Sequence, residues 1–224
     1  MADVADLFNA DGLNLQNASP PVQLALALGL STLRPAALMT MTCFTRVVIV
    51  LSFVRQGLGA QQVPPNLVIT GLALFLSLFI MKPTIDKIDA TALTPYLNKQ
   101  ITGPEAVKQA ETAVKEFMLR HTRKADLALF LHLAKNNAVE KKEDTPFFTL
   151  LPAFVISELK TAFIMGFCIY LPFLMVDLVV SSVLTSMGMV MMPPVTISAP
   201  FKILLFVLAD GWHLVSHALA ASYQ

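Results

Sequence analysis

Few residues in this sequence have the types and spacing that catalysis requires. His213 and His217 lie one helical turn apart, but no glutamate follows His213, so the HExxH pattern of zinc proteases is absent. Asp177 and Asp210 lie in apolar segments, yet neither belongs to a motif typical of an intramembrane aspartyl protease. The sequence also has no glycine-rich phosphate loop. We therefore expect no catalytic residues, no cofactor and no metal, and we interpret the two histidines as polar packing near a helix end.

The composition is typical of a membrane-associated protein. Of the 224 residues, 55% are hydrophobic and 14% are charged, whereas about a quarter of the residues in a soluble domain are usually charged. The mean hydropathy is +0.66. The net charge of +1 argues against a nucleic-acid partner, because no basic face would be available for phosphates. Cys43 and Cys168 have neither metal-ligand nor redox spacing, so we interpret both as packing residues. The acidic start lacks the basic region of a signal peptide, so we expect no cleavable signal.

The charged residues gather in one part of the chain. Of 31 charged residues, 20 lie in the range 82–144, eleven positive and nine negative. We therefore predict a short acidic segment at 1–19, apolar helices with an arginine-containing connection at 20–81, a charged, mostly helical soluble insert at 82–146, and apolar helical hairpins at 147–224. In the insert, Gly103-Pro104-Glu105 predicts a helix start, because proline suits the first helical position and an acid suits the first turn. We expect this helix to run to about Lys135, with Asn136-Asn137 as its C-cap.

The apolar segments predict an all-α, membrane-associated fold. The candidate spans are 22–44, 66–81, 147–184 and 201–219. Each contains charge or proline or, at 66–81, is shorter than the roughly 20 residues that a span needs. This favours kinked helical hairpins packed inside an assembly over free spans in lipid. The first 33 residues lack lysine and arginine, whereas Arg46 and Arg55 lie in the first connection. This asymmetry predicts that the N-terminus and the insert lie on the outer side of the membrane.

Charged residues inside these apolar segments should be paired. A charge at bilayer depth costs several kcal/mol unless it is paired or hydrated. Acids and bases nearly balance: they are Glu158, Asp177 and Asp210 against Arg34, Arg46, Arg55, Lys160 and Lys202. We predict ion pairs between helices or between subunits, with Glu158 and Lys202 as the first choice. A proton relay through Asp177 and Asp210 is the alternative.

A methionine-rich segment lies between two of the apolar stretches. It reads Met-Gly-Met-Val-Met-Met-Pro-Pro over 187–194, with four of the chain's eleven methionines and no charge. Gly188, Pro193 and Pro194 should break any helix here, which predicts a loop within 185–200. Irregular backbone at membrane depth survives only when it is buried in protein or lines a water-filled cavity. The segment is therefore a packed turn or the lining of a path, and the absence of charge favours the lining.

Several blocks of the sequence resemble the FliP family of export-gate proteins, in the family's order and from about residue 20 to the C-terminus. The N-terminal blocks are Met41-Thr42-Cys43-Phe44-Thr45-Arg46, Arg55-Gln56-Gly57-Leu58-Gly59 and Pro64-Pro65-Asn66. The C-terminal blocks are Leu151-Pro152-Ala153-Phe154, Ser157-Glu158-Leu159-Lys160-Thr161-Ala162-Phe163, Leu171-Pro172-Phe173, Asp177-Leu178-Val179, Met187-Gly188-Met189, Pro193-Pro194, Pro200-Phe201-Lys202 and Asp210-Gly211-Trp212. Within the family, Asp86-Lys87-Ile88, Glu116-Phe117-Met118-Leu119-Arg120 and Arg123-Lys124-Ala125-Asp126-Leu127 resemble the flagellar branch.

The resemblance implies a pore-forming subunit of the flagellar export gate and no enzymatic activity. Family members form a ring-like helical assembly of several copies with FliQ and FliR, at the base of the flagellum in the bacterial inner membrane. The resemblance also implies a periplasmic insert and, as further partners, FlhB, FlhA, other basal-body components, lipid and unfolded flagellar export substrates.

The resemblance also assigns a role to the methionine segment. The family's methionine loop closes the conduit as a gasket, which corresponds here to Met189, Met191 and Met192, with Val190 in a replaced position. The alternative is a proton- or ion-conducting channel subunit, which should have titratable groups along its path. An intramembrane hydrolase is a third reading, disfavoured because its motifs are missing.

Overall fold

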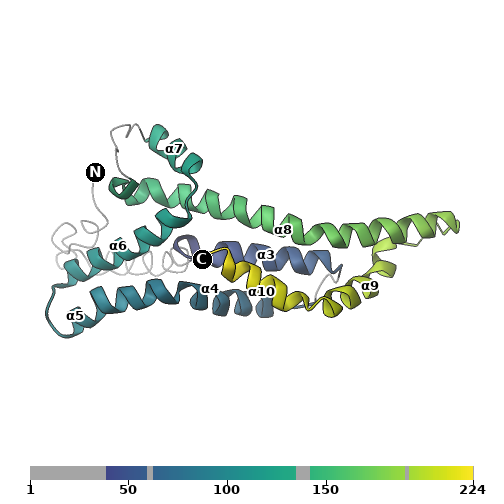
Figure 1. Ribbon diagram of the computed structural model, residues 1–224, viewed down its shortest axis with the longest axis horizontal. Coiled ribbons are helices and arrows are strands. Elements are labelled where there is room, and N and C mark those ends of the chain that lie inside the picture. The colour runs from purple at the N-terminus through teal and green to yellow at the C-terminus, as the bar shows by residue number, and fades with distance from the viewer. Residues whose placement is uncertain (1–38, 60–62, 135–141, 190–191, 224) are drawn as a thin grey trace, which may run out of the picture. The chain divides into compact units, whose positions relative to one another are not determined.

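The computed structural model describes residues 39–59, 63–134, 142–189 and 192–223, and all regular structure within these ranges is helical, as expected. The described residues form two compact units. Unit 1 contains residues 81–158 and those before Phe44, and unit 2 contains residues 44–80 and those from Leu159 onward. Two helices, α4 (Asn66–Ile88) and α8 (Phe147–Ser186), each belong partly to both units (Figure 1).

The core of unit 2 is built around α3 (Phe44–Gly57). Its buried apolar side chains recur at three- and four-residue spacing, as expected for a helix packed against its neighbours; they are Val47, Val50, Leu51 and Val54. These side chains belong to a cluster that takes residues from every other helix of the unit, including α9 (Pro194–Leu208) and α10 (Gly211–Ala221). The contributing residues are Ile69 and Ala73 of α4, Ala162 and Phe173 of α8, Phe206 of α9, and Val215 and Leu219 of α10. Helix α3 is therefore the centre of unit 2.

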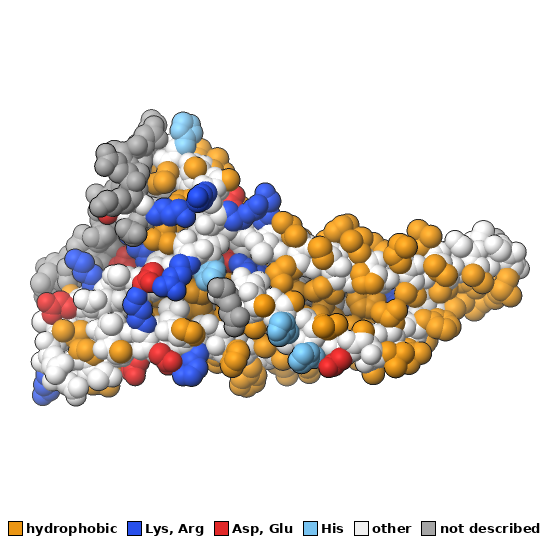
Figure 2. Space-filling view, in the orientation of Figure 1, with side chains coloured by type: hydrophobic (Ala, Val, Ile, Leu, Met, Phe, Trp, Pro, Cys, Tyr) orange, Lys and Arg blue, Asp and Glu red, His pale blue; other side chains and the backbone are white. Residues whose placement is uncertain are grey.

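The outer faces of unit 2 are apolar. Large hydrophobic side chains on α4, α8 and α9 are exposed, among them Phe75, Phe163, Leu178, Phe201 and Leu208, and hydrophobic side chains cover much of α8 and α9 (Figure 2). Within the described residues, two helices are long and apolar enough to cross a membrane, at 66–97 and 147–186. Helices α9 and α10 meet at a bend of 63°, and they give a third span if this bent pair is counted as one. The surface is thus suited to lipid or to other apolar protein surfaces.

Two of the expected spans differ from the sequence prediction. The segment at 66–81 is not short, because α4 continues past Lys82 and Pro83 to Ile88. Lys82 Nζ lies 2.9 Å from Asp86 Oδ2 one turn later, and both side chains are exposed. Helix α8 runs without a break from Phe147 to Ser186, so the charges and the proline in the expected span 147–184 do not interrupt it. The first expected span, 22–44, lies outside the described residues except for its last six.

Unit 1 confirms the predicted helix start. It consists of the end of α4, the π-helix η1 (Asp89–Leu93), α5 (Thr94–Leu97), α6 (Gly103–His121), α7 (Lys124–Leu133), the short 3-10 helix η2 (Lys142–Asp144) and the beginning of α8. Helix α6 begins at Gly103, with Pro104 and Glu105 in its first turn. The backbone N–H and the hydroxyl of Thr102 donate hydrogen bonds of 2.8 and 2.9 Å to the Glu105 carboxylate. These bonds fix the start of the helix.

The prediction of one helix from 103 to about 135 is wrong. Helix α6 ends at His121 and α7 begins at Lys124, because Thr122 and Arg123 have extended backbone. The N–H of Arg123 donates to the Ser157 hydroxyl at 3.0 Å, and that hydroxyl donates to Asp126 at 2.7 Å. A side chain from α8 thus takes the hydrogen bond that a continuous helix would have made. Helix α7 ends at Leu133, and the predicted C-cap at 136–137 lies outside the described residues.

Candidate functional site

The methionine segment follows a helix end that glycine makes possible. Gly188 has a φ of +74°, and the N–H groups of Gly188 and Met189 donate to the carbonyls of Thr185 and Leu184, both at 3.0 Å. This is a Schellman motif, in which a left-handed residue ends the helix and satisfies its last carbonyls. Helix α9 then begins at Pro194. The predicted helix breakers Gly188, Pro193 and Pro194 therefore lie at the two ends of a loop, the methionine loop, over 187–193.

The methionines of this loop that the structure describes do not pack into the core of the chain. Met187, Met189 and Met192 are exposed by 68%, 38% and 46%. Val190 and Met191, the other two residues of the expected gasket, lie outside the described residues. The sequence over 187–193 contains no charged residue. The described thioether side chains are therefore available to a surface outside this chain, which a turn packed in the protomer's own core would not allow.

An ion pair between a buried lysine and a partly buried aspartate joins the two helices that flank the loop. Lys202 Nζ on α9 lies 2.5 Å from Asp177 Oδ2 on α8, and the lysine side chain is almost wholly buried. The hydroxyl of Ser198, one turn before Lys202, donates to Asp177 Oδ1 at 2.5 Å. Both carboxylate oxygens therefore accept hydrogen bonds from α9, and the charges of the pair are compensated inside an apolar unit.

This pair corrects the pairing that we had ranked first. We expected Glu158 to meet Lys202, and the structure gives Lys202 to Asp177 instead. Asp177 follows Glu158 on the same helix by roughly five turns, so one lysine side chain cannot reach both carboxylates. Glu158 is itself fully buried. The error arose because the charges in the sequence predict that an acid pairs with Lys202 but do not predict which turn of α8 faces α9.

The other charged residues that we singled out lie apart from this pair. Arg46 is buried at the start of α3, where its guanidinium donates to the Ser222 hydroxyl at 2.9 Å and lies 3.9 Å from the centroid of the Tyr223 ring. Asp210 is exposed at the bend between α9 and α10 and has a left-handed backbone with a φ of 50°. Lys160 is also exposed. Of the predicted charged residues, the structure thus brings Asp177 and Lys202 together.

Sequence reasoning missed two contributors to the site. Ser198 lies at i−4 from Lys202, a spacing that places both on one helical face, and this could have indicated a shared partner. Gly59, just after α3, has a φ of +70°. A Cβ added there would lie 3.6 Å from Lys202 Nζ and 3.7 Å from Ala199 Cβ. A glycine after a helix gave no indication of this neighbour, because the contact is made by a distant part of the chain.

Known proteins are similar to this chain along most of its length. The sequence profile of the FliP family matches residues 27–219. The flagellar biosynthetic protein FliP of Bacillus subtilis (strain 168) is 55% identical over 208 residues, which cover 93% of this chain and 94% of that protein. The chain belongs to the FliP family. The flagellar biosynthetic protein FliP of Aquifex aeolicus (strain VF5) is 52% identical over 205 residues, which cover 91% of this chain and 86% of that protein.

The FliP-family match confirms the resemblance that the sequence blocks indicated. The matched range includes the methionine loop, the Asp177–Lys202 pair and the buried Arg46. Among the residues that the structure describes, no three side chains of histidine, cysteine, aspartate or glutamate come close enough to share a metal ion. The site of interest in this FliP-family chain is therefore the methionine loop with the two helices that carry it.

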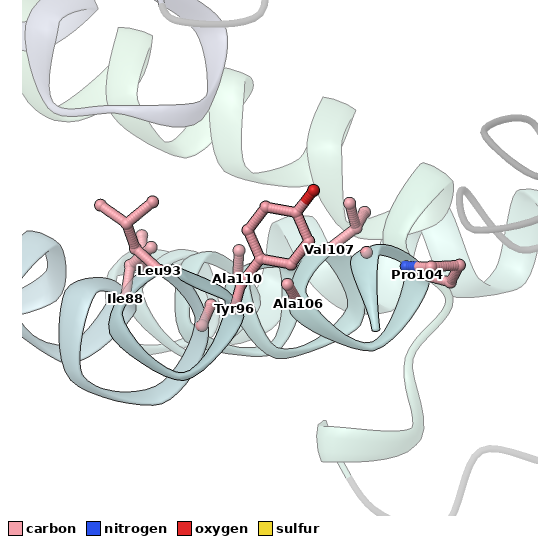
Figure 3. Close-up of a pocket in the computed structure, with 9 residues that line it drawn as sticks. Ile88, Leu93, Tyr96, Pro104, Ala106, Val107 and Ala110 are labelled. Carbon is pink, nitrogen blue, oxygen red and sulfur yellow. The ribbon is translucent and has the colours of Figure 1, made fainter. Parts of the chain in front are cut away.

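Unit 1 has an open groove of a different character. It has a volume of about 540 Å³ and an almost entirely apolar lining from the end of α4, η1, α5 and α6. Figure 3 shows the Tyr96 ring in the middle of the groove, with Ile88 and Leu93 toward one end and Val107 and Pro104 toward the other. None of the predicted site residues line this groove. Its chemistry is that of a packing surface and offers no acid, base or nucleophile besides the Tyr96 hydroxyl.

Proposed function

We propose that this chain is the core pore-forming subunit of the flagellar protein export gate. Several copies would surround a narrow conduit through which unfolded flagellar subunits leave the cytoplasm. The FliP-family membership and the similarity to flagellar biosynthetic proteins support the flagellar role. The observation that carries the pore role is the methionine loop, whose described thioether side chains are uncharged and exposed at the end of a helical hairpin. The subunit supplies a passage and no catalytic group.

The chemistry of methionine fits a seal that must open around many different chains. The side chain is unbranched and polarizable, so it adapts its shape to dissimilar surfaces. A ring of such side chains closes a conduit to ions at rest, because it offers neither charge nor hydrogen bonds to a hydrated ion. It then deforms around an extended polypeptide. In this proposal Met189, Met191 and Met192 form the ring, and the β-branched Val190 stiffens it slightly.

The partners follow from the surfaces that one chain leaves uncovered. The apolar outer faces of α4, α8 and α9 must meet lipid, further copies of the chain, or other membrane subunits such as FliQ and FliR. Contacts with FlhB, FlhA and other basal-body components belong to the same proposal. The protein would lie in the bacterial inner membrane at the flagellar basal body, with the charged insert at 82–146 on the periplasmic side. The absence of lysine and arginine before Arg34 supports this orientation.

The test is the resting ion leak of cells that carry the whole export complex. Replacing Met189, Met191 and Met192 together by alanine should raise membrane conductance and salt sensitivity, while the complex still assembles. A matched control replaces Met175, an exposed methionine on α8 outside the loop, and should leave the conductance unchanged. An unchanged conductance with normal export in the triple variant would refute the gasket.

A further inference from the structure

We propose that Asp177 and Lys202 are positioning residues for the seal: their ion pair holds α9 in register against α8 and so fixes where the methionine loop lies. The inference rests on the proposed gasket function. It concerns two residues outside the methionine loop, a buried lysine on α9 and a partly buried aspartate on α8.

The position of the pair along the hairpin is the first argument. Asp177 lies about nine residues before the end of α8, and Lys202 lies about eight residues after the start of α9, so each is roughly 13 Å from the loop along its helix. A tie at matching heights on both arms prevents one helix from sliding along the other. A slip by one turn would move the loop end of α9 by about 5.4 Å, which is comparable to the size of a methionine side chain.

The scarcity of charged residues along this part of the hairpin is the second argument. Over 161–209, which contains the later part of α8, the loop and α9, Asp177 and Lys202 are the only charged residues in the sequence; Glu158 and Lys160 lie earlier on α8. Apolar contacts are non-directional, so they do little to fix the position of one helix along the other. Both arms also contain a proline close to the pair, Pro172 and Pro200, and each proline removes one backbone hydrogen bond from its helix. The pair is therefore the contact best able to define the register.

The geometry of the pair is the third argument. Ser198 and Lys202 present two donors one turn apart, and each donates to a different oxygen of the same carboxylate at 2.5 Å. Moving α9 by a turn would break both bonds together and leave a buried unpaired lysine, which is strongly unfavourable. The hairpin therefore has one preferred register rather than a continuous range.

The experiment separates charge balance from register in the complete export complex. The neutral variant Asp177→Asn with Lys202→Gln removes both charges, so no buried charge is left unpaired. We expect this variant to assemble and export but to leak ions at rest, as strongly as the triple methionine variant. The reversed variant Asp177→Lys with Lys202→Asp places the same two side chains across the same gap. We expect it to leak less than the neutral variant, because it keeps the ion pair although Ser198 loses its carboxylate acceptor; a merely space-filling role would not predict this difference.

The control and the contrary outcomes keep the two proposals apart. Neutralising the exposed Lys82–Asp86 pair should leave the leak unchanged. If the neutral variant stays sealed while the triple methionine variant leaks, the positioning role is wrong and the gasket stands. If neutral and reversed variants leak equally, the ion pair does not set the register. If neither the neutral nor the triple methionine variant leaks, the gasket itself is wrong. Should the double variants fail to assemble, Ser198→Ala decides: a leak supports the inference and an intact seal overturns it.

Discussion

Replacing Gly57 by alanine should destabilise unit 2, although alanine is the better helix former. Gly57 is the last residue of α3, and a Cβ added there would collide with the ring of Phe173 on α8. Phe173 is buried and packs against Phe206, with ring centroids 6.1 Å apart, so its ring has little room to move. Overpacking of a core typically costs about 1–3 kcal/mol, whereas a helical Gly→Ala exchange gains roughly 0.5–1 kcal/mol. Subtracting the gain from the cost leaves a net loss of roughly 0–2.5 kcal/mol, centred on about 1 kcal/mol.

Gly71 on α4 is the matched control. It belongs to the same unit, and an added Cβ there would meet nothing within 4 Å. Gly71→Ala should therefore raise stability by roughly 0.5–1 kcal/mol. The assay is unfolding of the full chain in mixed micelles, followed by the fluorescence of Trp212. This is the chain's single tryptophan, and its ring lies 5.2 Å from that of Phe206 in the same unit.

The steric argument has a further consequence that can refute it. In a Phe173→Leu background the smaller side chain leaves room, so Gly57→Ala should cost clearly less than in the wild type. Contacting residues typically couple by about 0.5–3 kcal/mol. If Gly57→Ala stabilises the chain as much as Gly71→Ala, or if its cost is the same in both backgrounds, the ring of Phe173 does not occupy that space and the reasoning fails.

The remaining predictions concern unit 1. Hydrogen bonds from Lys87 and Arg120 lower the pKa of Glu116 below its ordinary 4.5. The stabilisation is therefore present above about pH 4.5 and is lost as the pH falls through the folded pKa; because the pair is exposed, it should amount to less than about 1 kcal/mol. Glu116→Gln should remove this acid dependence when stability is measured against pH. Hydrogen bonds from the backbone N–H and the hydroxyl of Thr102 lower the pKa of Glu105. Thr102→Ala removes the hydroxyl and keeps the backbone bond, so it should raise this pKa only part of the way to its ordinary value. It should also make hydrogen exchange in the first turn of α6 several-fold faster. An unchanged Glu105 titration by NMR would contradict the assigned role of the hydroxyl.

Local signals in the sequence predicted the helical fold and three of the helix ends. The start of α6 followed from Gly103-Pro104-Glu105, and the helix ends beside the methionine loop followed from Gly188 and the paired prolines. These features depend on the backbone chemistry of a few adjacent residues. Glycine adopts a positive φ readily and proline lacks an N–H, wherever in a fold they occur.

The errors arose where a distant part of the chain decides. The break after His121 depends on the Ser157 hydroxyl, which takes the N–H of Arg123. The partner of Lys202 depends on which turn of α8 faces α9, and both Glu158 and Asp177 fitted the expected charge. The sequence supplied the set of charged residues at the candidate site, but their pairing depends on helix register, which hydropathy and charge do not encode.

The two parts of the hairpin impose different physical requirements. The base must be rigid, and here it is a packed unit in which α8 approaches α3 closely: a Cβ added at Gly166 would collide with the ring of Phe53, as one at Gly57 would with Phe173. In the proposed gasket the tip must adapt to dissimilar chains, and its described methionines are exposed. If the base were flexible as well, the tip would leave the closed position for part of the time and the conduit would then be open. A directional tie such as the Asp177–Lys202 pair, placed where the base ends, allows the tip to deform while its mean position stays fixed.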